Sequence, residues 1–453
     1  MTIHLKGFCL PCPDAVPIIA CTSLDDLNCD GVLELQRQGF KAQAGKFCFF
    51  HDKGTLKVAL GIKDDQDWRS WSDAASHLPS GRYCLEDTPN DAVIRGWGSG
   101  SYRYRAKTLT AQLCLADQQA PMLALVRAEY MTRFLIDHPA NRLTPARLAR
   151  RAQGILSKLA SERLILTREI IGTELLAQNF PLIYHVGKAA ESPPRLLEMK
   201  WRSIKSDAPT ITIIGKGVCF DTGGLDIKPR AAMLVMKKDM GGAAHAIGLA
   251  AMLLSAELNV NIHLILGIAE NAIAGNAMHP GDIFTARNGS TVEIGDTDAE
   301  GRLVLADCLS YASESYSDLM IDFATLIGAA RVALGTDLPA LFCNNDSLAA
   351  HLTACNHDPI WRLPLHEPYR EELSGRISTL NSAPGGGYGG AITAALFLEH
   401  FVAKGRAWAH LDLMAYTPKN IHGRRMGAAA QGLYGILEGI SSWTPLFTYL
   451  SRI

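Results

Sequence analysis

Five polar residues in the middle of the chain have the types and spacing for metal chemistry. Lys216 and Asp221 lie at the end of an apolar, strand-like run, and Asp239 precedes a run of small residues that begins a helix. Asp298 and Glu300 follow another apolar run, two positions apart, so in an extended loop both side chains point the same way. Four carboxylates gathered at strand ends would repel one another, and burial would raise their pKa values. A pair of divalent cations removes that penalty, so the pattern predicts a two-metal site.

Each of these residues also has a simpler interpretation. Lys216 stands between two glycines, which is typical of a solvated turn. Asp221 can cap a turn and Asp239 can cap the following helix. Asp298 and Glu300 can favour the positive end of the helix that follows them. The presence of all five in one α/β region favours the metal site over five independent local roles.

The composition is that of an ordinary globular protein with more than one domain. The chain has 453 residues, of which 48% are hydrophobic and 20% are charged, and this length exceeds what one hydrophobic core usually supports. A formal net charge of −1 gives no reason to expect nucleic acid or an anionic membrane as a partner. The N-terminus lacks a signal-peptide pattern and no apolar run is long enough to span a bilayer, so we expect a cytoplasmic protein.

The chain has eleven cysteines, and in an intracellular protein their scattered positions predict reduced, mostly buried thiols. Cys9 and Cys12 have the C-x-x-C spacing of redox and zinc sites. No second C-x-x-C and no βαβ pattern accompanies them, so we interpret this pair as structural.

The elements that must hold the predicted site belong to an α/β protein. Residues 1–137 mix short strand-like runs with helical segments and are expected to form a smaller N-terminal α/β domain. A linker helix is expected within 138–165, where Thr144 is a good N-cap for a helix that begins at Pro145. In residues 166–453 apolar strands alternate with helices, which predicts a catalytic α/β domain around a mixed, largely parallel central sheet. Sites in such sheets lie at the carboxyl ends of strands.

The individual elements follow from the apolar runs. In the N-terminal part we predict strand-like runs at Ala15–Ala20, Leu56–Ile62 and Met122–Val126. In the catalytic part we predict strands at Leu182–Val186, Ile211–Cys219, Val260–Ala269, Leu319–Ala324, Leu338–Cys343 and Trp408–Leu413. Helices are predicted at Gly242–Ala256 and Arg302–Ser315.

Three blocks of the sequence resemble the leucyl (cytosol) aminopeptidase family. Residues 297–303 read T-D-A-E-G-R-L and match that family's N-T-D-A-E-G-R-L signature except at its first position, where this chain has Asp296. Residues 215–229 and 238–243 match two further blocks in the same order. The resemblance covers about residues 137–440, and three long motifs in order are far more specific than one short pattern.

The resemblance implies a metal-dependent aminopeptidase with two divalent ions, Zn²⁺ or Mn²⁺, and the oxygen-rich ligand set makes Mg²⁺ a third candidate. It implies Lys228 and Arg302 as the catalytic pair, with a bicarbonate ion held by Arg302 as the general base. One ion would be held by Lys216, Asp221, Asp239 and Glu300, and the second by Asp221, Asp298 and Glu300.

The resemblance also implies peptide substrates and a homohexameric assembly. The candidates that it gives for the substrate pocket are Met236, Thr325, Leu326, Gly328 and Met414.

Elementary chemistry agrees with these implied roles. Lys216 can bind a metal only as a neutral amine, and removing its proton near neutral pH costs roughly 4–5 kcal/mol, which coordination must offset. Lys228, which stays charged, can stabilise the oxyanion of a tetrahedral intermediate. A metal pair makes water a usable nucleophile near neutral pH, and a metal that binds the free α-amine of the substrate explains exopeptidase action.

Two departures leave the substrate preference open. Asp296 adds a carboxylate near Asp298, which either shifts the metal preference toward harder ions or only makes a local interaction. Met414 stands where the family has a small residue, so it either narrows the side-chain pocket or fills core. Two alternatives therefore stay open: a dipeptidase of the cysteinylglycine type, and a DNA-binding regulatory role in addition to peptidase activity.

Three other features are poor candidates for the site. Residues 385–390 satisfy G-x-G-x-x-G but follow a proline-containing loop, so we predict a tight turn near the active site and no dinucleotide site. His245 and His279 are isolated and are expected to be hydrogen-bonded core or loop residues.

Overall fold

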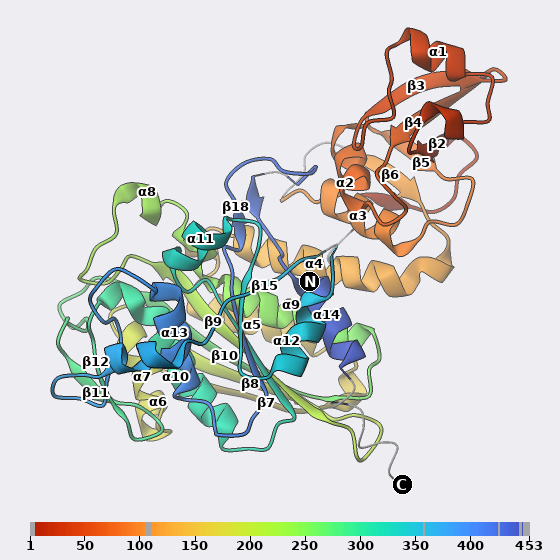
Figure 1. Ribbon diagram of the computed structural model, residues 1–453. Helices are drawn as coiled ribbons and strands as arrows, with labels where there is room; N and C mark the ends of the chain where they lie inside the picture. Colours follow the sequence, from red (N-terminus) through yellow and green to blue (C-terminus); the bar gives the residue numbers. More distant parts are fainter. Residues whose placement is uncertain (1–4, 105–109, 357, 425, 444–445, 447–453) are drawn as a thin grey trace. The chain divides into compact units, whose positions relative to one another are not determined.

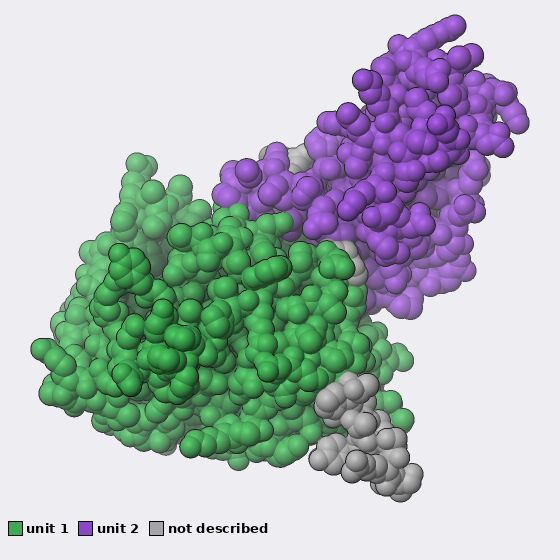
Figure 2. All heavy atoms as spheres, viewed as in Figure 1, with its two compact units in different colours: residues 1, 132–416, 428–453 green, residues 2–131, 417–427 purple. Residues whose placement is uncertain are grey.

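The computed structural model describes residues 5–104, 110–356, 358–424, 426–443 and 446. It divides the chain into two compact units (Figure 2). Unit 1 contains residues 132–416 and 428–453, and unit 2 contains residues 2–131 together with 417–427. Unit 2 thus takes in a short segment from near the C-terminus. The segment 138–165, for which a linker helix is predicted, contains helix α5 (Pro145–Leu156), which lies in unit 1.

Unit 2 is built on a six-stranded mixed sheet. Its strand order is β1-β6-β5-β2-β4-β3, and all neighbours are parallel except the hairpin of β3 and β4. The strands are β1 (Phe8–Cys9), β2 (Val16–Cys21), β3 (Phe47–Asp52), β4 (Thr55–Gly61), β5 (Gly81–Cys84) and β6 (Ala111–Cys114). The helices are α1 (Val32–Arg37), α2 (Trp68–His77) and α3 (Asp91–Ser101), followed by α4 (Ala120–Asp137), whose last residues belong to unit 1.

Unit 1 is built on an eight-stranded sheet (Figure 1) in the order β15-β14-β17-β13-β9-β10-β8-β7. The four central strands β17, β13, β9 and β10 are parallel, and β14 and β8 flank them in antiparallel orientation. The strands are β7 (Leu164–Ile171), β8 (Arg195–Trp201), β9 (Thr210–Asp221), β10 (Asn261–Asn271), β13 (Leu319–Ala324), β14 (Ala340–Cys343), β15 (Trp361–Arg362) and β17 (Trp408–Asp412). The predicted α/β fold with a largely parallel central sheet is confirmed.

Helices cover both faces of this sheet. Helix α9 (Gly241–Ser255) is apolar on all sides and almost completely buried, as expected for a helix at the centre of a large core. Helix α10 (Glu300–Ser313) packs with α7 (Pro181–Gly187) and α13 (Gly390–Glu399) over a core that includes Ile214 and Val218 of β9. Because side chains alternate along a strand, Lys216 points to the same face as Ile214 and Val218, toward α10.

Most predicted strands are observed within a residue or two, but two apolar runs were assigned wrongly. Leu182–Val186 lies in helix α7, which begins at Pro181, a favourable first helical position. Met122–Val126 lies in helix α4. A short apolar run fits a buried helix as well as a strand, and only the tertiary packing distinguishes the two.

Unit 1 also contains a small three-stranded sheet and several short helices, and the two-residue strands β18 (Tyr416–Thr417) and β19 (Gly427–Ala428) pair at its boundary with unit 2 in sequence. The strands β11 (Ile283–Thr285), β12 (Thr291–Glu293) and β16 (Leu380–Asn381) form a small sheet next to the loop that precedes α10. The remaining helices of unit 1 are α6 (Glu174–Ala177), α8 (Arg230–Met233), α11 (Gly328–Leu334), α12 (Asp346–Thr353) and α14 (Leu433–Ser442).

Among the described residues, none of the helices combines the length and apolar character needed to cross a membrane.

Candidate metal centre

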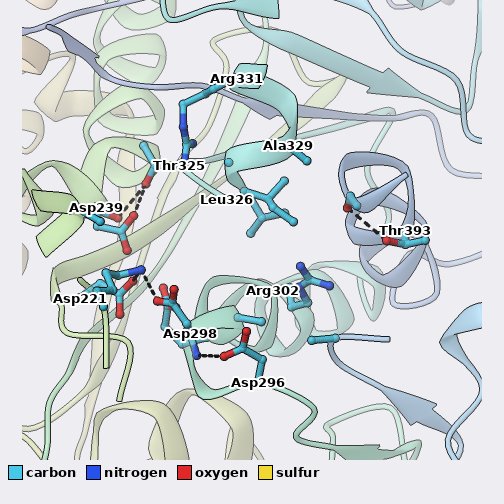
Figure 3. Close-up of a pocket in the computed structure, with 18 of the residues that line it drawn as sticks. Asp221, Asp239, Asp296, Asp298, Arg302, Thr325, Leu326, Ala329, Arg331 and Thr393 are labelled. Carbon is cyan, nitrogen blue, oxygen red and sulfur yellow. Dashed lines mark hydrogen bonds and ion pairs between the residues drawn. The ribbon is translucent and has the colours of Figure 1, made fainter. Parts of the chain in front are cut away.

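The five residues predicted to bind metal converge near the carboxyl end of strand β9. Lys216 and Asp221 belong to β9 itself, and Asp239 lies in a 3₁₀ turn (Met236–Met240) that leads into α9. Asp298 lies in a second 3₁₀ turn (Thr297–Ala299), and Glu300 is the first residue of α10. Figure 3 shows Asp221, Asp239 and Asp298 gathered along one side of a pocket. Segments 84 residues apart in sequence, from 216 to 300, therefore meet in one place.

Lys216 is buried between two carboxylates. Its Nζ lies 2.7 Å from Oδ2 of Asp239 and 2.8 Å from Oε1 of Glu300, and its side chain is only 2% exposed. Burial opposes the charge of the ammonium, but Asp239, Glu300 and Asp221 outweigh burial and raise the pKa of Lys216. Without a metal ion, Lys216 is thus a cation that balances the carboxylates around it.

Lys228 occupies an equivalent position between Asp221 and Asp298. Its Nζ lies 2.7 Å from Oδ2 of Asp221 and is also hydrogen-bonded to Oδ1 of Asp298. Burial lowers the pKa of Lys228, but the two carboxylates outweigh burial and raise it above its ordinary value. Burial and the charge of Asp221 raise the pKa of Asp298 to about 6, against the opposing effect of Lys228.

Three of the carboxylates are close enough to share one cation. One oxygen each of Asp221, Asp298 and Glu300 lies within 4.8 Å of the others. Burial, followed by the charge of Asp221, raises the pKa of Glu300 well above its ordinary value, although Lys216 opposes this rise. The centre therefore carries the electrostatic penalty that the sequence predicts for clustered carboxylates, and two lysines offset part of it.

A second layer of hydrogen bonds fixes these side chains. Asn271 donates its Nδ2 to Oδ1 of Asp221 at 2.8 Å, and the hydroxyl of Thr325 donates to Oδ1 of Asp239 at 2.7 Å. The carboxylate of Asp296 accepts from the backbone amide of Asp298 at 2.8 Å and caps the turn. An asparagine would accept the same hydrogen bond, so the departure from the family signature keeps the local structure.

Arg302 reaches the same pocket from the first turn of α10. Its Nη1 donates to the carbonyl of Ser382 at 2.5 Å, and its Nε is buried with no hydrogen-bond partner among the described residues. Burial lowers the pKa of Arg302 to about 10, which is still well above neutral pH, so the guanidinium stays charged. A charged donor without a partner is suited to an anion that enters the pocket.

The pocket has a volume of about 540 Å³ and is lined by all seven predicted metal and catalytic residues. Met236, Thr325, Leu326 and Gly328 also line it, as predicted for the substrate pocket. Met414 is half-buried and is not among the lining residues.

Sequence reasoning missed several residues of this pocket. Lys238 and Arg331 are two further cations that line it, and burial lowers the pKa of Lys238 to about 8. Lys238 was part of a family block, and its position next to Asp239 was the available signal. Gly387, Tyr388 and Gly390 also line the pocket, so the glycine-rich segment forms the predicted turn near the site, with φ of 74° at Gly387.

Comparison with known proteins decides the family. Residues 130–435 match the model of the cytosol aminopeptidase family, catalytic domain. The chain belongs to the cytosol aminopeptidase family. A probable cytosol aminopeptidase of Nostoc punctiforme is 40% identical over 330 residues, which cover 72% of this chain and 64% of that protein. The corresponding protein of Synechococcus sp. is 38% identical over 373 residues, which cover 78% of this chain and 75% of that protein. This chain thus spans a little under two thirds of the Nostoc relative.

Two solved structures have the same fold over nearly the whole chain. A cytosol aminopeptidase from Coxiella burnetii is 38% identical with a TM-score of 0.88, covering 96% of this chain and 98% of that chain. The bottromycin maturation enzyme BotP in complex with Mn is 29% identical with a TM-score of 0.85, covering 95% of this chain and 99% of that chain. The similarity to the Coxiella structure extends beyond the catalytic region into unit 2.

Proposed function

We propose that this protein is a metal-dependent aminopeptidase that removes the N-terminal residue from peptides. The observation that carries the proposal is the convergence of Asp221, Asp298 and Glu300 within 4.8 Å, beside a buried Lys216 that bridges Asp239 and Glu300. Membership of the cytosol aminopeptidase family supports the same activity.

The residues of this centre fit two divalent ions. Lys216, Asp221, Asp239 and Glu300 would hold one ion, and Asp221, Asp298 and Glu300 would hold the other. Oxygen ligands with one amine suit Zn²⁺, Mn²⁺ or Mg²⁺, and the Mn in the BotP structure supports Mn²⁺ as one candidate. When bound, such ions would polarise the scissile carbonyl and lower the pKa of the attacking water.

Two cations of the chain itself would act on the reacting groups. Lys228 carries its proton at neutral pH, and it would turn from Asp221 and Asp298 toward the developing oxyanion of the substrate once these carboxylates hold metal. Arg302 would hold a bicarbonate ion through its unpaired Nε, and bicarbonate would supply the general base. The buried guanidinium orients such an anion because its other end is fixed on the carbonyl of Ser382.

The pocket suits the first residues of a peptide. Its volume of about 540 Å³ is within the usual range for small-molecule sites. Met236 and Leu326 would contact the first side chain of the substrate, with Thr325 and Gly328 at the same wall. A role for Met414 stays a prediction.

The family resemblance also supports a homohexamer and, with the names of the relatives, a cytoplasmic location. Light scattering of the purified protein tests the assembly. We expect a mass of six times the 49.1 kDa of one chain. A monomer or dimer at micromolar concentration contradicts the hexamer and leaves the peptidase proposal intact.

A metal-reconstitution assay tests the activity. Protein stripped with a chelator should lose hydrolysis of aminoacyl amides and regain it with Mn²⁺ or Zn²⁺, whereas N-acetylated substrates should resist cleavage throughout. Glu300→Ala should lower kcat/KM at least about 100-fold at saturating metal. Glu162→Ala, a change of an exposed carboxylate elsewhere in unit 1, is the matched control and should leave kcat/KM unchanged. Full activity of Glu300→Ala or of the stripped protein would refute the proposal.

A further inference from the structure

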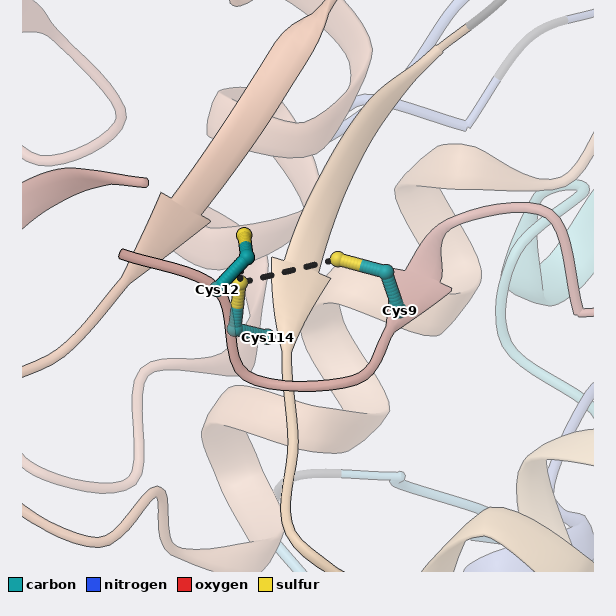
Figure 4. A group of neighbouring side chains, drawn as sticks. All are labelled: Cys9, Cys12 and Cys114. Carbon is teal, nitrogen blue, oxygen red and sulfur yellow. Dashed lines mark hydrogen bonds between the residues drawn. The ribbon is translucent and has the colours of Figure 1, made fainter. Parts of the chain in front are cut away.

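Three cysteine side chains meet at one edge of the sheet of unit 2. Sγ of Cys114 lies 3.5 Å from Sγ of Cys9 and 3.4 Å from Sγ of Cys12, and all three sulfurs lie within 4.8 Å of one another. Figure 4 shows them side by side, with Cys9 at the end of β1 and Cys114 at the end of β6. We call these three residues the cysteine cluster.

The topology of the sheet brings the cluster together. Strands β1 and β6 are parallel neighbours, and Cys9 and Cys114 are direct partners in the register, so both side chains leave the same face at the same end. The chain then turns through Leu10 and Pro11, which returns Cys12 to the same point. A third cysteine, 102 residues away from Cys12 in sequence, thus completes the C-x-x-C pair.

The spacing of the sulfurs fits metal ligation. In a tetrahedral zinc site with Zn–S bonds of about 2.3 Å, neighbouring sulfurs lie about 3.8 Å apart. The two Sγ–Sγ distances of 3.4 and 3.5 Å are close to that value and far above the length of a disulfide bond, about 2.05 Å. A disulfide would also join only two of the three sulfurs, whereas Cys114 is in contact with both others.

The surroundings of the cluster allow an ion to enter and favour a soft metal. Cys9 and Cys12 are half-buried, and Cys114 is buried with 8% of its surface exposed. Arg82 and Asp14 form an ion pair at 3.5 Å on the neighbouring segments. Burial raises the pKa of the Cys9 thiol above its ordinary value although the positive charge of Arg82 opposes the rise, so it is the bound metal that must displace the proton. Thiolates select Zn²⁺ or Cu⁺ over the Mn²⁺ and Mg²⁺ that suit carboxylates.

We propose that Cys9, Cys12 and Cys114 form a second metal site, which binds one thiophilic ion such as Zn²⁺ through three thiolates. Binding of one Zn²⁺ by three thiols forms three Zn–S bonds and releases three protons to the solvent, with no change in oxidation state. The fourth coordination position is left to water, because the described residues bring three sulfurs to this point. The site would tie the loop after β1 to the end of β6 and stabilise unit 2.

This site is independent of the proposed peptidase centre. The cysteine cluster lies in unit 2, whereas the carboxylates and lysines of the peptidase centre lie in unit 1 and include no sulfur ligand. The two sites therefore have different spectroscopic properties, and failure of one proposal does not bear on the other.

Cobalt is the probe that separates the sites, since Co²⁺ bound to thiolate gives a near-ultraviolet charge-transfer absorption and Co²⁺ bound to carboxylate or amine does not. Full-length protein, reduced and stripped of metal, is titrated with Co²⁺. We expect the absorption to saturate at an amplitude that corresponds to one thiolate-bound Co²⁺ per chain, with the Co²⁺ taken up by the carboxylate centre adding nothing to it, and to be abolished by excess Zn²⁺. Cys12→Ser and Cys114→Ser should each remove most of the absorption.

The matched control is Cys48→Ser, because Cys48 is a half-buried cysteine on β3, at the opposite edge of the same sheet. It should leave the absorption unchanged. Circular dichroism checks that each variant is folded, and Cys12→Ser, which changes a loop, provides the test even if Cys114→Ser does not fold. Absence of the charge-transfer absorption in the wild-type protein, or its persistence in folded Cys12→Ser, would overturn the proposal.

Discussion

Replacement of Lys216 by methionine is the sharpest test of how the carboxylates of the peptidase centre are balanced. The side chain is 2% exposed, and its Nζ lies 2.7 and 2.8 Å from the carboxylates of Asp239 and Glu300. Methionine keeps most of the volume and the apolar stem, so the change removes mainly the positive charge. Removing one partner of a buried ion pair costs about 3–5 kcal/mol, because the remaining charges stay buried and uncompensated.

In the presence of a chelator, Lys216→Met should therefore unfold on the order of 10 °C below the wild-type protein. Saturating Mn²⁺ should recover part of this loss, since bound ions replace the missing positive charge and stabilise the folded state by about 3 kcal/mol at 100 times Kd. Differential scanning calorimetry with and without Mn²⁺ measures both effects.

Lys205→Met is the matched control, because Lys205 is exposed in the same unit. It should change the unfolding temperature by no more than about 1 or 2 °C. The reasoning is refuted if Lys216→Met and Lys205→Met unfold at the same temperature in chelator. It is also refuted if saturating Mn²⁺ leaves the unfolding temperature of Lys216→Met at its value in chelator.

Three further predictions concern packing and pH. In Gly301→Ala the new Cβ would stand 2.6 Å from Cε of Lys216, so the lysine side chain must move. We expect the metal affinity measured by titration calorimetry to fall about 10-fold or more, and an unchanged affinity contradicts this prediction. His245 is fully buried with both ring nitrogens hydrogen-bonded to backbone, and burial lowers its pKa to about 4. Since the pKa of a histidine in the unfolded chain is higher, the neutral ring contributes fully to the free energy of unfolding above about pH 6.5, and this contribution falls by about 3 kcal/mol toward pH 4. His245→Phe should therefore flatten the dependence of the free energy of unfolding on pH between these values. Asp322→Ala removes the carboxylate that lies 2.5 Å from the buried ring of His410. The free energy of unfolding measured by urea denaturation should fall by about 3 kcal/mol or more, and a fall of less than about 1 kcal/mol contradicts a stabilising role of the pair.

The sequence alone was sufficient for the family and the fold class, and it singled out residues that the structure brings together in one pocket. Lys216, Asp298 and Glu300 lie in motifs whose order along the chain is specific, and the alternation of apolar strands with helices predicts a largely parallel sheet. Each motif consists of residues that are neighbours in the sequence, so it can be recognised without knowing which distant segments are in contact.

Features that depend on which distant segments meet could not be read in this way. The apolar run at residues 182–186 is as compatible with a strand as with a helix, and in the structure it packs against α10 as part of helix α7. Met414 was predicted from its position in a family block, but it is not among the residues that line the pocket in the structure, and its role stays a prediction. Lys216 can pair with two carboxylates only because its side chain leaves β9 on the face of the sheet where those carboxylates lie.

The cysteine cluster shows the same limit most clearly. From the sequence, Cys9 and Cys12 form an isolated pair, and we interpreted it as structural because no other pair accompanies it. The parallel register of β1 and β6 supplies Cys114 as the third sulfur, 3.4 Å from Cys12. Local sequence determines which residues can do chemistry, whereas the pairing of strands far apart in the chain decides which of them lie within reach of one another.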